Sequence, residues 1–313
     1  MSAPVKVPGP LAELLVGQPR LARHLTHLPR AAASLAPLLL VGEAGTGRTA
    51  LARAAHAESP RRNAPLVELD AGAVPVALFE SELFGHRPGA FTGATTVSAG
   101  RLARAAGGSL LLDHVEEFPL AVQPKLLRVL SEGVYAPLGD VDRPADVRVI
   151  SIADDNLAER LERGTFRRDL FHRLEVLAFR VPPLRERPTD LPSLCDRLVA
   201  DLAERYGRPG LELAPEACAW MREHRWPGNL RELKNVLERA VLSTPPGVPL
   251  NPEPPVARRP PRVVPRPLAE VEAEAIRAAL VYTEGHQTEA ARLLGISRKS
   301  LWERRKRLAA GPH

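Results

Sequence analysis

The sequence has little of what marks a disulfide-rich or membrane-spanning protein. Its 313 residues contain two cysteines, Cys195 and Cys218, so there is no disulfide framework and a reducing cytoplasm is the expected compartment. Both thiols are expected to fill small buried sites. No apolar stretch approaches the length of a membrane span, because the clearest run, at 38–41, is strand-sized. Residues 1–10 also lack the charged-then-apolar order of a secretory signal.

Net positive charge is absent from most of the chain. Residues 1–255 carry 31 Lys and Arg against 31 Asp and Glu, whereas residues 256–313 carry 12 against 6. The net charge of +6 therefore lies entirely in the C-terminal segment. A neutral body with a basic end indicates nucleic-acid binding at the C-terminus. A basic, solvated end also occurs in proteins that bind no nucleic acid.

Proline divides the body from the basic end. Ten prolines between Pro245 and Pro267 remove backbone donors, which predicts an extended, semi-rigid linker over 245–267. Before it, residues 1–182 alternate short apolar runs with helix-like segments, the pattern of an α/β domain with a parallel sheet covered by helices. These runs lie at 38–41, 66–69, 110–112 and 147–152. The next part, 183–244, reads as helices only and is expected to form a small lid.

A glycine-rich loop follows the first apolar run. Gly42, Gly45 and Gly47 precede Arg48, Thr49 and a helical segment. This is the spacing of a phosphate-binding loop, in which backbone N–H groups hold the phosphates of ATP and the Thr hydroxyl reaches Mg²⁺. Arg48 stands where that motif has Lys, and it keeps the charge on a wider planar fork. Taken alone, the pattern is also compatible with an ordinary strand-turn-helix glycine loop.

A carboxylate ends the apolar run at 110–112. Asp113 follows that run directly and is a candidate for holding Mg²⁺ through its water shell. The next residue, His114, can accept a proton in principle. A protonated imidazole beside Mg²⁺ would be repelled by the metal and would not act as a base.

The most specific pattern lies near residues 85–95. Glycines at Gly89 and Gly93 flank a tip made of Phe91 and Thr92, so the tip can be raised or lowered when the supporting helices move. A surface turn whose Phe folds back is the alternative for these residues alone. With residues 80–86 in front of it, the stretch resembles the loop by which bacterial enhancer-binding proteins, the AAA+ activators of sigma-54 RNA polymerase, contact sigma-54. The resemblance makes Phe91 and Thr92 the contact residues.

This resemblance runs from about residue 15 to the C-terminus and exposes departures from the family at the nucleotide site. The family has Glu at the position of His114, where it polarises the attacking water. It has Asn at Asp70, which pairs with that Glu and couples nucleotide state to the loop, and Asn at Asp154, which senses the γ-phosphate. The resemblance therefore implies a degenerate hydrolytic centre. A hydrogen bond between Asp70 and His114 would preserve the mechanical link while hydrolysis is lost.

Other motifs of the family are intact. Residues 166–174 resemble the segment that projects two arginines into the neighbouring subunit of a hexameric or similar ring, which implies this role for Arg167 and Arg173. Pairing of either Arg with Asp169 or another acid on a solvated helix is the alternative. Residues 226–233 resemble the lid motif that places Arg231 against the nucleotide within its own subunit.

The last segment, 268–313, has the pattern of a helix-turn-helix. Helical spacing of Val271, Ala275, Ala278 and Ala279 is followed by a short second helix, a tight turn at 295–296 and a third helix capped by Ser297. The module resembles the Fis type that closes most enhancer-binding proteins. A basic helical hairpin used in assembly is the alternative.

The third helix carries the candidate DNA contacts. Its first residues, Arg298, Lys299 and Ser300, are expected at base edges, and the run 304–307, which includes Arg304 and Arg305, at phosphates.

Together these features predict a cytoplasmic, DNA-bound, ring-forming regulator of sigma-54 promoters, acting from upstream enhancer-like sites. The chain lacks the N-terminal sensory domain of many relatives, so control is expected from a separate regulatory protein, from abundance, or not at all. Two alternatives stay open. One is an AAA+ ATPase acting on another substrate, such as a helicase loader or unfoldase. The other is a DNA-binding regulator with a nucleotide-gated or inert AAA+ scaffold, which the altered positions Arg48, Asp70, His114 and Asp154 favour.

Overall fold

The computed structural model describes residues 9–254, 268–283 and 285–309. The chain forms two compact units, Met1–Pro255 and Val256–His313. Their boundary falls in the proline-rich segment, of which residues 255–267 lie outside the described residues. No helix of the described ranges is long and apolar enough to cross a membrane.

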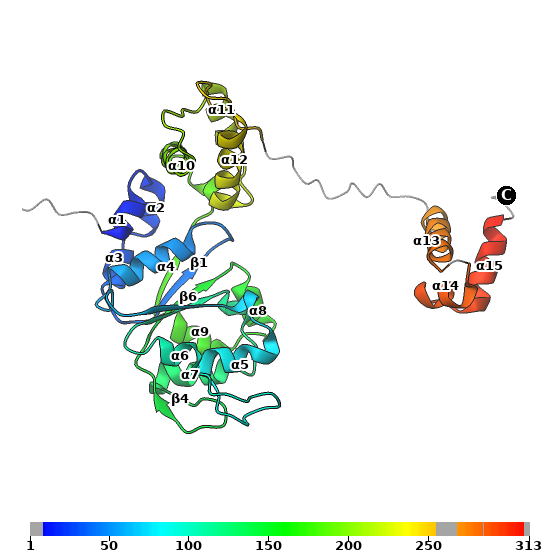
Figure 1. The fold of residues 1–313 in the computed structure, drawn as a ribbon, viewed down its shortest axis with the longest axis horizontal. Coiled ribbons are helices and arrows are strands. Elements are labelled where there is room, and N and C mark those ends of the chain that lie inside the picture. Colours follow the sequence, from blue (N-terminus) through cyan, green and yellow to red (C-terminus); the bar gives the residue numbers. More distant parts are fainter. Residues whose placement is uncertain (1–8, 255–267, 284, 310–313) are drawn as a thin grey trace, which may run out of the picture. The chain divides into compact units, whose positions relative to one another are not determined.

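Five parallel strands form the centre of the larger unit, in the order β2-β3-β6-β1-β7 (Figure 1). All four apolar runs predicted as strands are confirmed. The fifth strand was missed because it alternates half-buried and exposed residues at the sheet edge. The bounds are β1 (Leu38–Val41), β2 (Leu66–Asp70), β3 (Ser109–Asp113), β6 (Arg148–Ala153) and β7 (Leu177–Arg180).

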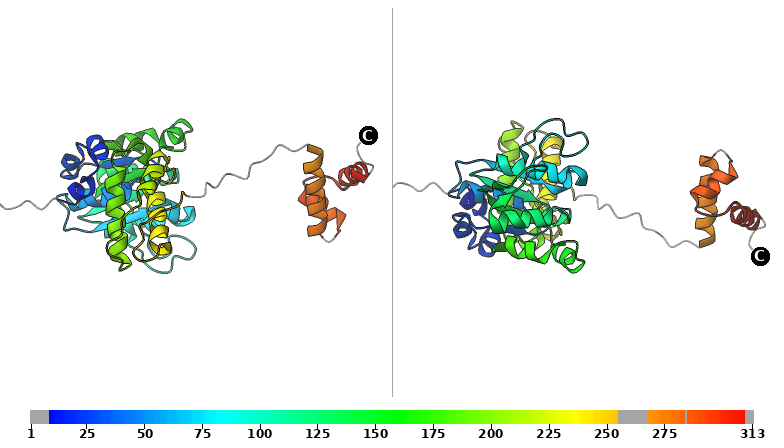
Figure 2. Two further views of the ribbon diagram at one scale, coloured as in Figure 1. Left: turned by 90° about the horizontal axis from the view of Figure 1, so that it is seen from above. Right: turned by 90° about the horizontal axis from the view of Figure 1, so that it is seen from below.

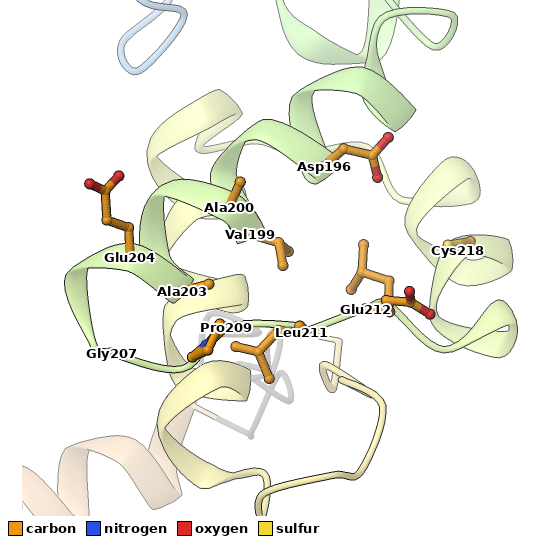
Figure 3. Close-up of a pocket in the computed structure, with 12 residues that line it drawn as sticks. Asp196, Val199, Ala200, Ala203, Glu204, Gly207, Pro209, Leu211, Glu212 and Cys218 are labelled. Atoms are coloured by element: carbon orange, nitrogen blue, oxygen red, sulfur yellow. The ribbon is translucent and has the colours of Figure 1, made fainter.

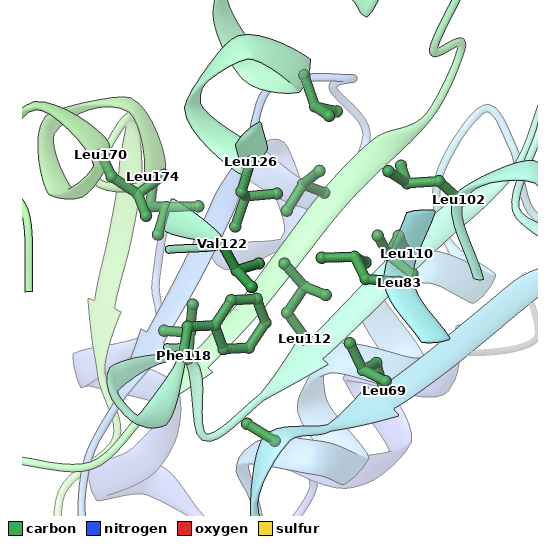
Figure 4. Packing of buried hydrophobic residues seen from close by; sticks show 14 of the residues in the cluster. Leu69, Leu83, Leu102, Leu110, Leu112, Phe118, Val122, Leu126, Leu170 and Leu174 are labelled. Carbon is green, nitrogen blue, oxygen red and sulfur yellow. The ribbon is translucent and has the colours of Figure 1, made fainter. Parts of the chain in front are cut away.

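Helices cover both faces of this sheet (Figure 1, Figure 2). One face packs against α1 (Pro10–Leu15), α2 (Pro19–His24), α3 (Leu28–Ala32) and α4 (Arg48–Ala57). The other packs against α5 (Val76–Phe84), α6 (Gly100–Arg104), α7 (Gln123–Glu132), α8 (Leu157–Glu162) and α9 (Arg168–Leu174). Leu110 and Leu112 enter the second core, whereas Leu111 enters the first, because successive strand residues point to opposite faces (Figure 4).

Short elements complete this α/β part. The 3₁₀ turns η1 (Ala71–Ala73) and η2 (Val115–Glu117) follow β2 and β3 directly, and η3 (Leu184–Glu186) precedes the lid. A two-stranded antiparallel ladder joins β4 (Val134–Tyr135) to β5 (Arg143–Pro144).

The lid consists of α10 (Leu191–Arg205), α11 (Pro215–Glu223) and α12 (Asn229–Ser243) around its own apolar core. Leu250 is buried in that core and pairs with Leu213, so the chain stays packed on the lid beyond the expected boundary at 244. Cys195 is buried in α10, and burial raises the pKa of its thiol to about 12. Cys218 is only half-buried and lines a pocket between α10 and the 207–213 segment (Figure 3).

The C-terminal unit contains α13 (Leu268–Tyr282), α14 (Gln287–Leu293) and α15 (Arg298–Ala309). Its core is formed by Ile276, Ala279, Ala290, Ala291 and Leu301. The helix predicted from the spacing of Ala275, Ala278 and Ala279 is confirmed as α13. Ala275 and Ala278 are exposed, and the buried stripe of α13 runs through Ile276 and Ala279. The larger Ile side chain gains more from burial than an Ala does. The side chain of Val271 lies outside the described residues.

Candidate functional site

The glycine loop joins β1 to α4 in the geometry of an anion-binding turn. Gly45 and Gly47 have φ angles of 79° and 100°, which glycine adopts without strain. A Cβ on Gly45 would lie 2.6 Å from the carbonyl oxygen of Gly228, and one on Gly42 would lie 2.5 Å from that of Val181. The loop therefore packs too closely for side chains, and α4 begins at Arg48 with its N–H groups available to phosphate.

Strand register brings Asp70 and Asp154 to the same side of the sheet, at the carboxyl ends of the parallel strands. Asp70 at the end of β2 is the register partner of Asp113 at the end of β3, and Val41 is the partner of Ala153, which precedes Asp154. The Thr49 hydroxyl, on α4, lies 3.3 Å from Oδ2 of Asp113. A hydroxyl and a carboxylate suit Mg²⁺, which takes few protein oxygens and completes its shell with phosphate and water. Thr49 and Asp113 are thus fit to hold the metal of a bound nucleotide.

Arg48 does not point freely into this site. Its side chain is only 6% exposed, one terminal nitrogen forms an ion pair with Asp154, and the other donates to the Ala153 carbonyl oxygen. Oδ1 of Asp154 contacts the guanidinium without a well-directed hydrogen bond. The two altered positions are therefore partners in the folded chain. The sequence treats the two positions separately and does not predict their contact, because Arg48 begins α4 whereas Asp154 follows β6.

His114 and Asp70 form the expected hydrogen bond. The imidazole Nδ1 lies 2.8 Å from Oδ1 of Asp70, and His114 has a left-handed backbone with φ 53° and ψ 48°. Burial disfavours the imidazolium, but the hydrogen bond to Asp70 and the charges of Asp113, Asp70 and Glu116 outweigh it and raise the pKa of His114. The hydrogen bond and these charges thus favour its protonated form.

A further carboxylate, Glu116, was missed by sequence reasoning. It lies in η2, is 1% exposed, and its Oε2 has no hydrogen-bond partner among the described residues. Burial raises its pKa, and the nearby charge of Asp154 acts in the same direction. Glu116 thus lies near Asp154, the ion-pair partner of the buried Arg48.

The lid touches the glycine loop through the start of α12. Asn229 is fully buried, and its Nδ2 donates to the Ala44 carbonyl oxygen at 3.0 Å while its Oδ1 accepts from Leu184 N at 2.8 Å. Leu230 N donates to the Gly45 carbonyl oxygen at 2.9 Å. Arg231 follows at the same contact, where its Cβ would lie 3.2 Å from a Cβ on Gly45. Asn229 belongs to the motif that predicted Arg231, but its role in joining lid to loop was not predicted.

Arg167 and Arg173 lie at opposite ends of α9. Arg167 caps the helix N-terminus and forms two hydrogen bonds to Asp169, of 3.0 and 2.6 Å. Arg173 lies in the last turn and is exposed. Within one chain, the pairing with Asp169 is thus realised for Arg167.

The loop at 85–95 holds its aromatic tip against a histidine. Phe91 is 38% exposed and meets His86 edge-on, with ring centroids 5.0 Å apart. His86 is in turn fixed by a 2.6 Å hydrogen bond between its Nδ1 and the Ser81 hydroxyl of α5. Thr92 is exposed. The tip is therefore in contact with the segment that follows α5.

The third helix of the C-terminal unit presents part of the predicted contact set. Ser297 caps α15, since its hydroxyl accepts from Ser300 N at 3.1 Å and lies 2.9 Å from the Ser300 hydroxyl. Arg298, Lys299 and Arg305 are exposed. Arg304 is half-buried and pairs with Glu272 of α13, so it also ties α15 to α13. The side chain of residue 307 lies outside the described residues.

Comparison with known families accounts for three consecutive parts of the chain. Residues 14–180 match the sigma-54 interaction domain, residues 185–250 match the AAA+ ATPase lid domain, and residues 267–308 match the bacterial regulatory protein domain of the Fis family. The first of these matches contains the sheet, the glycine loop and the loop at 85–95.

Individual proteins are similar over much of the chain. It is 44% identical over 225 residues to the alginate biosynthesis transcriptional regulatory protein AlgB of Pseudomonas aeruginosa, covering 72% of this chain and 50% of AlgB. It is 36% identical over 338 residues to the DNA-binding transcriptional regulator NtrC of Escherichia coli K12, covering 97% of this chain and 72% of NtrC. The chain thus spans only about half the length of AlgB.

A solved structure carries the same architecture. NtrX from Brucella abortus in complex with ATP matches with a TM-score of 0.67 and 31% identity, over 97% of this chain and 69% of NtrX. Because the sigma-54 interaction domain alone spans more than half of the chain, the protein belongs to the family of sigma-54-dependent AAA+ transcriptional regulators with a Fis-type DNA-binding domain.

Proposed function

We propose that this chain is a DNA-binding regulator that binds ATP and acts on sigma-54 RNA polymerase through Phe91 and Thr92, with a hydrolytic centre that is largely disabled. The single observation that carries the proposal is the domain order, a sigma-54 interaction domain followed by a lid and a Fis-type module. Nucleotide binding is supported by the positive-φ glycine loop at the start of α4 and by the Thr49–Asp113 pair. In this proposal the Fis-type module binds upstream DNA, with Arg298 and Lys299 at base edges.

The disabled centre is proposed from the contacts of His114. At the position where the family carries its catalytic Glu, the His114 side chain donates a hydrogen bond from its Nδ1–H to Oδ1 of Asp70. A general base must hold a free acceptor within hydrogen-bond reach of the attacking water. With Nδ1 engaged, only Nε2 of the neutral ring could do this, in place of the two carboxylate oxygens of a Glu, and turnover is expected to be slow or not measurable.

The link between nucleotide site and loop is proposed to survive. Asp70 ends β2 and also caps η1 by accepting from Gly72 N at 3.0 Å. The chain then runs through α5, which ends two residues before His86 and the loop. The His114–Asp70 hydrogen bond therefore lies at the N-terminal start of the segment that leads through α5 to Phe91. A shift of His114 on nucleotide binding would be transmitted along this segment.

Assembly into a hexameric or similar ring is part of the same proposal. Arg167 and Arg173 would reach the nucleotide of the next subunit, because a guanidinium binds phosphate oxygens bidentately and stays charged. For Arg167 this requires exchange of Asp169 for phosphate. Both residues are exposed, so such a contact exchanges solvated pairs and needs little rearrangement.

A second candidate function is a DNA-binding regulator with an inert AAA+ scaffold. The Arg48–Asp154 ion pair favours it, because the cation of the glycine loop already has an anionic partner within the chain.

Binding of purified sigma-54 to the full chain tests the proposal and separates the two candidates. The unaltered protein should bind sigma-54 in the presence of a non-hydrolysable ATP analogue. Phe91→Ala should abolish that binding and leave DNA binding unchanged. Leu120→Ala, at an exposed apolar residue outside the loop, serves as the matched control and should bind normally. Sigma-54 binding that Phe91→Ala leaves unaltered would refute the contact role and leave the scaffold reading.

A further inference from the structure

We propose that Asp154 acts as a built-in counter-anion for Arg48 and makes the nucleotide site select nucleoside diphosphates over triphosphates. This inference rests on the proposed nucleotide binding and specifies which nucleotide the resting protein prefers.

The Arg48 guanidinium is already engaged within the chain. Arg48 is the first residue of α4 and stands where a phosphate-binding loop directs its cation at the β- and γ-phosphates. Its two terminal nitrogens are taken by the Ala153 carbonyl oxygen and by Asp154. The Asp154 carboxylate therefore occupies the side of the cation that a terminal phosphate oxygen would need.

The β- and γ-phosphates of a bound nucleotide depend on Arg48 to different degrees. A β-phosphate is held mainly by the backbone N–H groups of the glycine loop and by the positive end of α4. These groups come from residues 42–49 and do not involve Asp154. A γ-phosphate depends more on the cation, so it must either displace Asp154 or lie beside its negative charge.

A second acidic residue lies near Asp154. Glu116 is buried near Asp154, and one of its oxygens has no hydrogen-bond partner among the described residues. Burial and the charge of Asp154 both raise the pKa of Glu116, so a further negative group is disfavoured at this place. A γ-phosphate would bring such a group to Asp154, whereas a diphosphate stops short of it.

The pair is also built to be exchangeable. The side chain of Asp154 is 31% exposed, and its Oδ1 lacks a well-directed hydrogen bond although it contacts Arg48. Triphosphate binding is therefore weakened and not forbidden, and Mg²⁺ would offset part of the penalty. Removal of the Asp154 charge should consequently strengthen triphosphate binding. In a family where the corresponding side chain senses the γ-phosphate, an alteration of that side chain would ordinarily weaken triphosphate binding.

Equilibrium binding of ADP and of the slowly hydrolysed analogue ATPγS, both with Mg²⁺, tests the inference on the full chain. The unaltered protein should bind ADP at least tenfold more tightly than ATPγS. Asp154→Asn, which keeps the shape and an acceptor oxygen, should lower that ratio at least tenfold by tightening ATPγS. Glu116→Gln should also lower the preference for ADP over ATPγS, by a smaller factor. Circular dichroism should show that each variant is folded.

Asp155→Asn is the matched control, because it removes one charge from the adjacent exposed residue, which contacts Arg180 and not Arg48. It should leave the ratio unchanged. A preference of the unaltered protein for ATPγS, or an Asp154→Asn ratio equal to that of the unaltered protein, would overturn the inference while leaving the proposed nucleotide binding intact. Absence of binding by every folded variant would overturn both, without touching sigma-54 or DNA binding.

Discussion

His114 donates its Nδ1 proton to Asp70 across the ends of two adjacent strands, at 2.8 Å. The resemblance implies that both residues depart from the family pattern, and it implies the same for Arg48 and Asp154, which form an ion pair between the start of α4 and the end of β6. The four departures thus form two contacts within the fold. Each pair combines a positive or protonatable group with a carboxylate, so the alterations compensate one another structurally.

The Arg48–Asp154 ion pair is expected to contribute to stability. Asp154→Ala leaves the nearly buried Arg48 without its anionic partner and should destabilise the fold by about 1–3 kcal/mol, the scale for leaving a buried polar group unsatisfied. Urea denaturation of both single variants and of Arg48→Met with Asp154→Ala gives the coupling. The double variant should lose less than the sum of the single losses. Strict additivity would show that the two side chains do not interact.

Asn229 is expected to hold the lid on the glycine loop. Asn229→Gly keeps a backbone that tolerates the φ of 51° but removes the side-chain hydrogen bonds to Ala44 and Leu184. The buried carbonyl and N–H left behind should cost about 1–3 kcal/mol of unfolding free energy in a urea titration. Asn251→Gly, at an exposed residue outside the lid helices, is the control and should change stability little. Equal losses in both variants would contradict the role of Asn229.

The strands β1, β2, β3 and β6 could be predicted from the sequence because each contains a short run of mainly apolar residues. The edge strand β7 could not, since its alternating exposure breaks that pattern. In the C-terminal unit the order of the helices was predictable from apolar spacing and turn residues. That spacing did not single out Ile276, which lies in the core of the unit together with Ala279.

For the site, residue type and spacing predicted the glycine loop and Asp113, and the family resemblance predicted the hydrogen bond of His114 to Asp70. The Arg48–Asp154 pair could not be predicted, because their contact depends on how the end of β6 meets α4. Glu116 gave no signal either, since a Glu beside other acids in a turn reads as solvated until burial is known. Asn229 was hidden because a buried amide at a helix start is indistinguishable in sequence from an exposed cap.

DNA recognition should divide between two exposed residues of α15. Arg298→Ala should relax sequence preference, and Arg305→Ala should weaken binding to all sequences and lower the slope of log affinity against log salt by about 1. Binding of the full chain to specific and scrambled duplexes at several salt concentrations measures both effects. An identical profile for the two variants would contradict the division. Arg304→Ala should in addition destabilise the unit, because it breaks the contact with Glu272.

The central claim is that this family member binds ATP with a hydrolytic centre replaced by internal pairs, and steady-state ATP turnover of the purified chain with its DNA tests it most directly. Each lost catalytic interaction commonly costs ~10²-fold in rate. Turnover of the unaltered protein should therefore be at or below detection. His114→Glu, Asp70→Asn and Arg48→Lys together should raise it far more than any one change, because residues acting as a unit are non-additive. Turnover by the unaltered protein at the rate of an ordinary family member, unchanged by the triple substitution, would contradict the account.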